Sequence, residues 1–483
     1  MKRNYLFLTI LLVCSTTMVA QVTIGSSEEP VKGALLDLKE DGTTSKGLGL
    51  PRVALQAYNK VKMGADAPEY TDKENHMGLV VYNVNPDYNQ CDTASIPPGL
   101  HIWDGQKWVG IGTPEHESPT PPNLPASLFN PNSYMVTTVG SASSITIPVA
   151  KAFAVWDFWT SEEGGKRLAD IPFSGSLSTS VVWQEALDGG NNNIVGTPVL
   201  STTNLDKNAT ITIPTTGNVG NALVSVSDAV GVRWSWHIWV TETPATNSYN
   251  GYVWMDRNLG ATSATPGNNG TLGLYYQWGR NTPIPGYTKF SGSDNKTTVP
   301  VQFAEVSDVV TNDGNNPAKQ NSLSYAIMHP LTFISSNNSP SDWYSTSTTV
   351  DWATRWAEQV QDSNCPAVSY SIASITNPCP EGWKVPEASN NTTSPWNGID
   401  NATNKVWTNG YNWIDPAAGY YPAAGYRNGG SNALVLINSS GWYWTASYDS
   451  DSSPRALRML SSVVNPWYRS NPAYSYSVRC VQK

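Results

Sequence analysis

The chain carries few charged side chains for its length. Lys, Arg, Asp and Glu make up 14% of its 483 residues, and the formal net charge is −9. The sequence has no block of Lys and Arg, and binding to phosphate groups requires clustered cations. We therefore expect no nucleic acid partner.

Long apolar segments are missing as well. Beyond the N-terminus, no stretch approaches the roughly eighteen apolar residues that a membrane-spanning helix needs. At the N-terminus, Lys2 and Arg3 precede a short apolar run, and small or short residues follow it up to Ala20. This pattern predicts a secretory signal peptide over residues 1–20, and hence an exported protein, extracellular or at a bacterial cell surface.

The same segment allows an alternative. Leu11-Leu12-Val13-Cys14 would be a lipoprotein site if Cys14 were acylated, and the lipid would then anchor the protein to a membrane. Val13 argues against this interpretation, because that position normally carries Gly or Ala. In both cases the mature chain is soluble or peripherally attached.

Cysteine is scarce. After removal of the signal peptide four remain, Cys91, Cys365, Cys379 and Cys480. Export permits disulfides, and the spacings contain neither a C-x-x-C pair nor a zinc pattern with histidine. We expect no metal binding by these cysteines.

Turn residues and two of the three aromatic residue types are abundant. The chain has 38 Gly and 34 Pro, and its 20 Trp and 23 Tyr far outnumber its 8 Phe. This composition favours β-strands and long loops with half-exposed aromatic side chains. The length suggests about three domains of ~150 residues.

Residues 21–112 alternate short strand-like runs with Gly turns, which predicts a small β-rich module. Asp104-Gly105 between two apolar runs indicates a hairpin. The module resembles the N-terminal attachment or assembly module of exported surface and fibre-like proteins from gut-type bacteria, on the segments 22–25, 34–38, 47–53 and 103–108. Residues 113–125 contain five prolines and predict an extended linker.

Residues 126–246 predict an immunoglobulin-like β-sandwich. Strand-like runs separated by turn residues recur at the spacing of such a sandwich. In the last run, Trp234, Trp236 and Ile238 share one face, opposite Ser235, His237 and Trp239. We expect the first three to be core residues.

Residues 247–483 predict one large domain with few regular elements and with long polar loops, including 335–348 and 387–404. A helix is expected only around 351–361, where apolar residues recur at helical spacing. Loops of such length in a compact domain usually bind something or are disordered.

Four motifs in this last domain resemble a known family. They are VWMDRNLG at 253–260, GLYYQWGR at 273–280, CPEGWKVP at 379–386 and SYSVRCV at 475–481. Together they resemble the Fibrobacter succinogenes major paralogous domain family, which is similar to C-type-lectin-like folds. The resemblance implies an α+β, C-type-lectin-like fold in which the start and end of the domain lie together. It also implies a disulfide between Cys379 and Cys480 that contributes ~4 kcal/mol by closing a long loop. It assigns no partner to Cys91 or Cys365.

The last fifty residues resemble the variable region of proteins diversified by retroelements (diversity-generating retroelement variable proteins). They begin with 441–447 and are dense in Ser, Tyr, Asn and Asp. Tyr and Trp offer rigid contact area, whereas the small polar residues offer adaptable hydrogen bonds, as in antibody loops. The simpler interpretation is polar loop residues with a few core aromatics. The predicted ligand-binding residues are Tyr443, Ser447, Tyr448, Asp449, Asp451, Ser453, Arg455, Asn465, Trp467, Tyr468, Arg469, Asn471, Tyr474 and Tyr476.

Within that region, strand parity separates core from contact residues. We expect Trp442, Trp444, Leu457, Met459 and Val478 to be core residues. Tyr443, Trp467 and Tyr468 are the aromatic residues that we expect to contact a ligand most directly.

Enzymatic chemistry finds little support in the sequence. The lectin-like fold family includes an oxidase that works through cysteines, but Cys379 and Cys480 look structural. The five histidines are scattered, without a nucleophile motif. We therefore predict no catalytic residue and no enzyme activity, and a carbohydrate-active enzyme is the weakest alternative.

The expectation for cofactors is none. Calcium stays open, because residues 291–295 and, separately, Asp449 and Asp451 could supply oxygen ligands, but no EF-hand loop or calcium-lectin signature is present. We therefore assign no metal site.

These features predict an adhesin-like surface protein that presents a C-terminal, lectin-like binding domain. The partner would be an unknown protein or glycan on another cell or a phage. The alternative is a structural subunit of a surface fibre or pilus.

Overall fold

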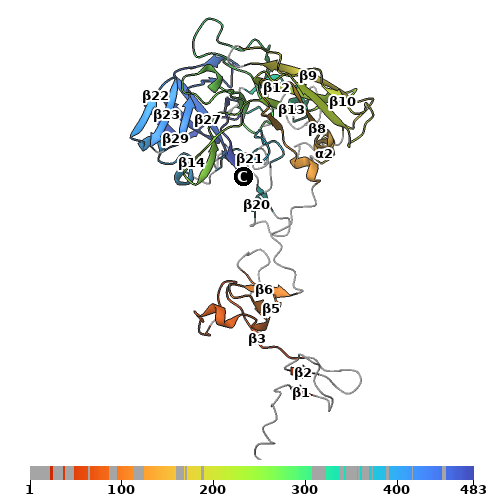
Figure 1. Cartoon of the computed structure of the whole chain (residues 1–483), viewed down its shortest axis with the longest axis vertical. Helices are drawn as coiled ribbons and strands as arrows, with labels where there is room; N and C mark the ends of the chain where they lie inside the picture. The colour runs from red at the N-terminus through yellow and green to blue at the C-terminus, as the bar shows by residue number, and fades with distance from the viewer. Residues whose placement is uncertain are drawn as a thin grey trace, which may run out of the picture. The chain divides into compact units, whose positions relative to one another are not determined.

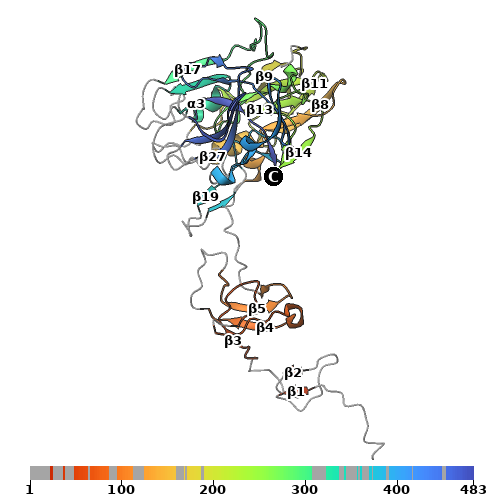
Figure 2. The same cartoon turned by 90° about the vertical axis from the view of Figure 1, so that its left-hand side faces the viewer.

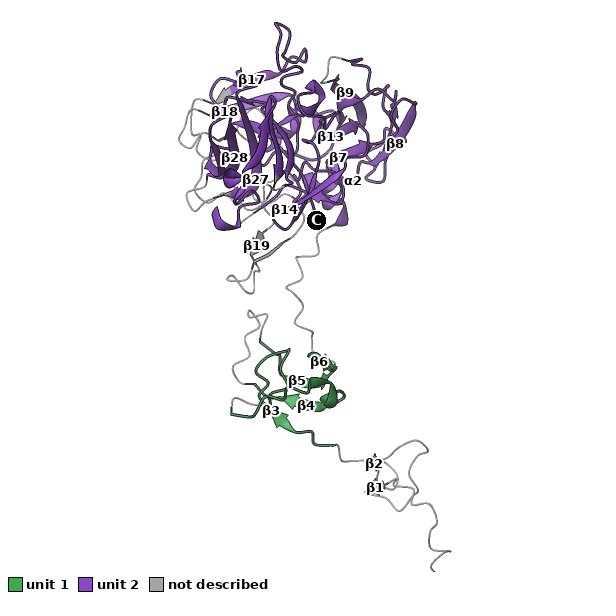
Figure 3. Ribbon diagram, turned by 60° about the vertical axis from the view of Figure 1, so that its left-hand side comes forward, with its two compact units in different colours: residues 1–119 green, residues 120–483 purple. Residues whose placement is uncertain are grey.

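The protein is multidomain and strongly β-rich. The computed structural model describes residues 22–24, 36–38, 48–63, 66–85, 95–111, 125–158, 168, 171–186, 190–306, 323–336, 342–343, 356, 359–361, 369–371, 374–387, 391–415, 417–448 and 453–483. The chain divides into two compact units, residues 1–119 and 120–483 (Figure 3). In the described part, no helix is long and apolar enough to cross a membrane.

Unit 1 contains two small sheets. One is a parallel pair, and the other has the strand order β3-β4-β5-β6. The turn between β5 and β6 is the predicted hairpin, in which the Asp104 carboxylate accepts the N–H groups of Gln106 and Lys107 at 2.8 and 2.7 Å. The strands are β1 (Val22–Ile24), β2 (Leu36–Leu38), β3 (Arg52–Val53), β4 (Val80–Asn83), β5 (Gly99–Trp103) and β6 (Trp108–Ile111), and Lys73–His76 form a 3-10 turn, η1.

The core of unit 1 is small. Trp103 and Trp108 lie in its centre with ring centroids 5.4 Å apart, and their indole N–H groups bond to backbone carbonyls at 2.8 Å. The other buried apolar members are Leu55, Val61, Val81 and Ile96.

Two sheets form the first part of unit 2, with the strand orders β7-β13-β12-β9 and β10-β11-β8. Between them lies a core that includes Trp234, Trp236 and Ile238, as predicted. The helix α2 (Ala150–Phe158) contributes Val155 and Trp156 to it. The strands are β7 (Ser133–Val136), β8 (Ser143–Pro148), β9 (Ser178–Glu185), β10 (Val199–Leu200), β11 (Thr210–Thr215), β12 (Gly220–Ser227) and β13 (Val232–Val240), preceded by the 3-10 turn η2 (Ala126–Phe129).

The second part of unit 2 brings its two ends together. β15 (Tyr252–Met255) and β31 (Val481–Gln482) pair in the sheet β14-β15-β31-β21, with Trp254 opposite Val481. The C-terminus therefore lies close to β14 and β21 (Figures 1 and 2). The predicted disulfide between Cys379 and Cys480 is present beside this sheet. The other strands of this sheet are β14 (Thr246–Tyr249) and β21 (Trp383–Lys384).

The largest sheet of unit 2 contains the segment predicted to bind a ligand. Its order is β26-β25-β30-β27-β28-β29, and β16 also pairs with β30. The strands are β16 (Tyr275–Gln277), β25 (Tyr426–Arg427), β26 (Leu434–Val435), β27 (Ser440–Tyr448), β28 (Pro454–Leu460), β29 (Val464–Arg469) and β30 (Ser475–Ser477).

Smaller elements complete unit 2. The strands β22 (Asn404–Trp407), β23 (Gly410–Asp415) and β24 (Gly419–Pro422) form one sheet, β17 (Gln302–Val306) pairs with β18 (Thr332–Ser336), and β19 (Gln359–Gln361) pairs with β20 (Ser369–Ser371). The helical pieces are α3 (Leu323–Met328), η4 (Asn269–Thr271), η6 (Asn391–Thr393) and η7 (Ile399–Asn401).

The helix expected around 351–361 is wrong at its C-terminal end. Residues 359–361 are the strand β19, which pairs antiparallel with β20. The antiparallel pairing satisfies the backbone there, and it overrides the helical spacing of Trp352, Trp356 and Val360. Of residues 351–358, only Trp356 lies inside the described part.

The two parts of unit 2 share their cores. Trp183, Leu223 and Trp239 of the first part pack in one apolar cluster with Trp278 and Trp444 of the second. Conversely, Leu323 and Ile334 of the second part belong to the core around Trp234 of the first part. Because the sheet of β12 and β13 is buried on both faces, the predicted boundary between residues 246 and 247 lies inside one compact unit.

Candidate functional site

The predicted ligand-binding residues that the structure describes lie on or beside the strands β27, β28, β29 and β30, on both faces of their sheet, and in the turn between β29 and β30. The two faces are distinct because side chains alternate along each strand. Trp442 and Trp444 point to one face, whereas Tyr443 points to the other, into the cluster of Leu457 and Met459. Other layers of unit 2 cover most of both faces. The predicted residues therefore range from fully buried to exposed.

Tyr443 is a framework residue, which corrects its predicted role as a contact. Its side chain is 0% exposed, and its hydroxyl donates a hydrogen bond to the carbonyl of Pro422 at 2.6 Å. Its ring meets Tyr421 edge to face at 5.0 Å. Burial raises the pKa of Tyr443 above its ordinary value.

Three further predicted residues also belong to the framework. Tyr476 is 2% exposed, stacks on Trp444 at 4.2 Å and pairs with the hydroxyl of Ser470 at 2.7 Å. Ser447 and Ser453 are buried. Tyr476 and Ser447 are in the interior because they stand at inward positions of β30 and β27, and Ser453 directly precedes β28.

The remaining described residues reach the surface. Arg455, Trp467, Tyr468, Asn471 and Tyr474 are half-buried, and Asn465 and Arg469 are exposed. Asp449, Asp451 and the side chain of Tyr448 lie outside the described residues.

At the rim of the sheet, Tyr426, Trp442, Arg458, Tyr468 and Tyr474 form a group that we call the aromatic–arginine cluster. Trp442 meets Tyr426 at 5.1 Å and Tyr468 at 5.0 Å, edge to face in both pairs. Tyr426 also lies 5.6 Å from Tyr474. Such pairs hold large aromatic surfaces in fixed orientations.

The guanidinium of Arg458 joins this cluster. Its central carbon lies 5.3 Å from the ring of Trp442 and 5.2 Å from the ring of Tyr468, within cation–π range. The β27–β28 register places it there, because Arg458 is directly opposite Trp442. Burial is the main cause that raises the pKa of Tyr426, and the neighbouring Tyr474 and Tyr468 raise it further. The cluster thus presents aromatic faces, phenol hydroxyls and one cation, and this combination of groups suits the binding of a ligand.

Sequence reasoning missed Tyr426 and Arg458. Tyr426 comes from β25, outside the segment dense in Tyr and Ser, and no local signal links it to that segment. Arg458 could have been found, because it alternates with Leu457 and Met459, which were predicted as core residues.

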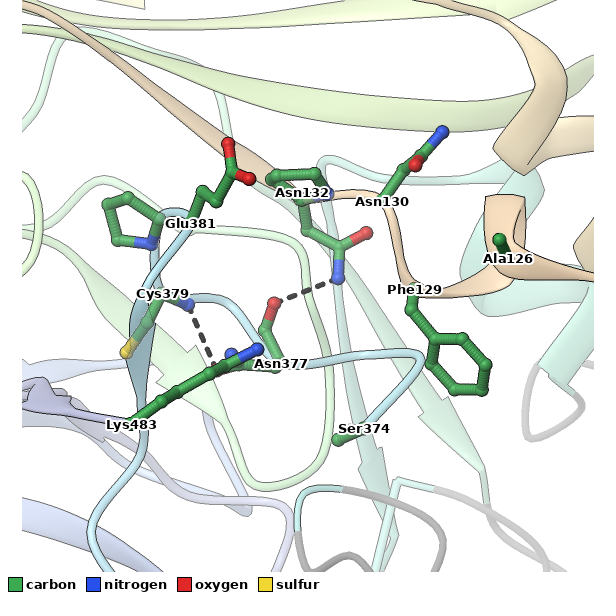
Figure 4. Close-up of a pocket in the computed structure, with 11 residues that line it drawn as sticks. Ala126, Phe129, Asn130, Asn132, Ser374, Asn377, Cys379, Glu381 and Lys483 are labelled. Atoms are coloured by element: carbon green, nitrogen blue, oxygen red, sulfur yellow. Dashed lines mark hydrogen bonds between the residues drawn. The ribbon is translucent and has the colours of Figure 1, made fainter. Parts of the chain in front are cut away.

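A polar pocket of about 200 Å³ lies elsewhere in unit 2, beside the disulfide. Its lining includes Asn130, Asn132, Asn377, Cys379 and Lys483 (Figure 4). The Asn132 amide donates to the carbonyls of Ile375 and Asn377, both at 2.8 Å. Asn132 therefore ties the loop before Cys379 to the strand β7.

A buried chain of hydrogen bonds links Ser133, His237 and Asn221. The Ser133 hydroxyl lies 2.7 Å from Nδ1 of His237, and Nε2 lies 2.8 Å from the side-chain oxygen of Asn221. This order resembles a nucleophile, base and orienting group, but all three residues are at most 1% exposed. Burial lowers the pKa of His237 to about 3. These hydrogen bonds therefore form an internal network that satisfies buried polar atoms.

Metal ligands do not gather in the described part of the chain. No group of three or more His, Cys, Asp or Glu residues there could hold an ion. In the segment 291–295, the Asp294 carboxylate pairs with Lys289 at 2.8 Å.

Part of the chain matches a known family. Residues 23–125 match the family described as phage tail like trimerisation region. No match was found among curated proteins or among solved structures. The matched range covers the sheet β3–β6 of unit 1. This family match fits a structural or fibre-like surface subunit better than it fits an adhesin. The sequence had left the structural subunit open as the alternative.

Proposed function

We propose that this protein is an exported subunit of a trimeric, phage-tail-like surface fibre, and that unit 1 joins three chains. The observation that carries the proposal is the match of residues 23–125 to a trimerisation region. Trimers are closed symmetric assemblies, so one chain supplies every contact that the assembly needs.

The strands β1 and β2 support this proposal. They form a parallel pair of three residues each, and Ile24, Leu36 and Leu38 are 56%, 51% and 40% exposed. Parallel strands are normally covered on both faces, and an isolated two-stranded sheet is marginally stable at best in water. Neighbouring chains would supply the missing cover.

Unit 2 is the part that the fibre would present. We infer that its first two sheets are an immunoglobulin-like sandwich and that the remainder is a C-type-lectin-like domain. Two features support the second assignment: β15 pairs with β31, which joins the start and end of that domain, and the disulfide joins Cys379 to Cys480 near its end. Retroelement-driven variation of the last fifty residues belongs to the same proposal and rests on their composition.

Ligand recognition is the second candidate function, and the aromatic–arginine cluster favours it. Half-buried Tyr side chains and an Arg are common in the energetic centres of protein interfaces. Aromatic faces with adjacent hydrogen-bonding groups also suit a sugar ring. A protein or glycan on another cell or a phage is therefore the proposed ligand, and no catalytic step or cofactor is needed for this role.

Removal of unit 1 tests the structural role. The mature chain, beginning at Gln21, is compared by mass photometry with a chain beginning at Thr120. We expect three chains per particle for the first and one for the second, with unchanged thermal unfolding of unit 2. Trimers of the shortened chain would contradict the proposal, because assembly would then reside in unit 2.

A further inference from the structure

The sheet β3–β6 of unit 1 has one face packed on its own core and one face left open. Burial alternates along the strands: Val81 and Trp103 are buried, whereas Val80 and Ile102 are half-exposed and Tyr82 is 46% exposed. The open face continues on β6, where Val109 is half-exposed and Ile111 is 43% exposed.

The open face consists of two cross-strand rows. Val80, Ile102 and Val109 are directly opposite one another in the first row. In the second row, Tyr82 pairs with Leu100, which pairs in turn with Ile111. The only charged residue on these rows is Arg52, which pairs with Tyr82 at the sheet edge.

This composition is unusual for a face in contact with water. An antiparallel sheet with one solvated face normally alternates apolar and polar residues. Here all six positions on β4, β5 and β6 are apolar, on adjacent strands and in register. A contiguous, partly exposed apolar patch of this kind marks an interaction surface.

The partner that fits is another copy of this chain. We propose that the open face of β4–β6 is the interchain contact of the trimer, with three copies turning Val80, Ile102 and Val109 towards a common threefold axis. This inference rests on the proposed trimeric function, since the matched range 23–125 contains the whole sheet. Arg52, at the edge of the sheet, would lie at the rim of the contact.

The size of unit 1 supports the same partner. Among its described residues, the core contains six buried apolar side chains. Modules with so small a core usually need a further source of stability, and oligomerisation is one. Burial of the open face would join three small cores into one larger core.

The substitution Ile102→Lys in the full mature chain tests this contact. Ile102 is in the middle strand and the middle of its row, so three lysines would meet at the proposed axis. We expect the mass measured by light scattering to fall threefold, from three chains to one. Met77→Lys is the matched control, because Met77 is 66% exposed and stands outside the strands β4, β5 and β6, and this variant should remain trimeric.

Hydrogen exchange distinguishes loss of the interchain contact from unfolding of the sheet. In the Ile102→Lys variant, slow exchange of the β4–β5 and β5–β6 amides would show that the sheet is still folded. If exchange is fast, Tyr82→Lys at the exposed end of the second row replaces it, with the same expected loss of trimer. A folded variant that stays trimeric would overturn the assigned contact but leave the trimeric function standing, whereas a monomeric parent chain would contradict the function itself.

Discussion

His237 shows how a buried polar residue makes stability depend on pH. Its two ring nitrogens are engaged by Ser133 and Asn221, and no charged partner appears among the groups that shift its pKa. The network can accommodate a neutral imidazole, whereas a charged one would lack compensation in the core.

We expect acid to destabilise unit 2 through this residue. The folded pKa is about 3, and that of an unfolded histidine is about 6.5. The stability is therefore fully present above pH ~6.5 and is lost as pH falls towards 3, because only the unfolded chain binds the proton. By pH ~4.5 the loss is about 2–3 kcal/mol in the free energy of unfolding.

Urea unfolding at several pH values checks this prediction. His237→Gln should be less stable at neutral pH but should lose less stability between pH 7 and 4.5 than the parent protein does. Parallel pH profiles for the two proteins would mean that His237 does not remain neutral in the fold.

The sequence could not reveal this network. It predicted the face on which His237 lies, but Ser133 is 104 residues away and comes from a strand parallel to β13. Nothing in local spacing connects the two. The same limit applies to the lining of the polar pocket, which combines residues near 130, 377 and 483.

At the scale of elements, strand parity was the most reliable guide. It placed Trp442, Trp444, Leu457 and Met459 in the core, and all are at most 6% exposed. It failed for Tyr443 because the opposite face of β27 was expected to be open. A second layer, with Tyr421 and Trp413, covers that face instead.

Alternation on β28 and β29 predicts opposite effects of two substitutions. Tyr468→Ala should abolish ligand binding while leaving the melting temperature almost unchanged, because Tyr468 is half-buried at the rim. Leu457→Ala should cost about 2–5 kcal/mol of stability, because Leu457 is 0% exposed.

Glycan and protein arrays probed with the full chain, together with calorimetry, measure both effects. The exposed Ser462, which is not among the predicted ligand-binding residues, is replaced by Ala as the control for a general loss of surface polarity. A large fall in the melting temperature of Tyr468→Ala would assign this tyrosine to the core and remove it from the proposed binding surface.

At the scale of the whole molecule, composition and turn signals predicted the β-rich character, because these depend on local patterns. The disulfide was predicted from the motif resemblance, and the structure contains it. The junction near residue 246 carries no such signal. Trp239 was assigned to the second face of one strand, and only the packed structure shows that this face is covered by the next part of the chain.

The two units also differ in the size of their apolar cores. Among the described residues, unit 2 holds four of the five apolar clusters, three of them with buried tryptophans, and a disulfide joins its Cys379 to Cys480. Unit 1 has one small cluster and leaves apolar residues exposed on two sheets. This contrast supports the proposal that unit 1 joins the chains and unit 2 is the part that the fibre presents.

The number of chains in the native particle tests this account most directly. Sedimentation equilibrium of the mature protein, over a hundredfold range of concentration, should give the mass of three chains throughout. A mass of one chain across that range would contradict the account, because the open face of unit 1 would then have no partner.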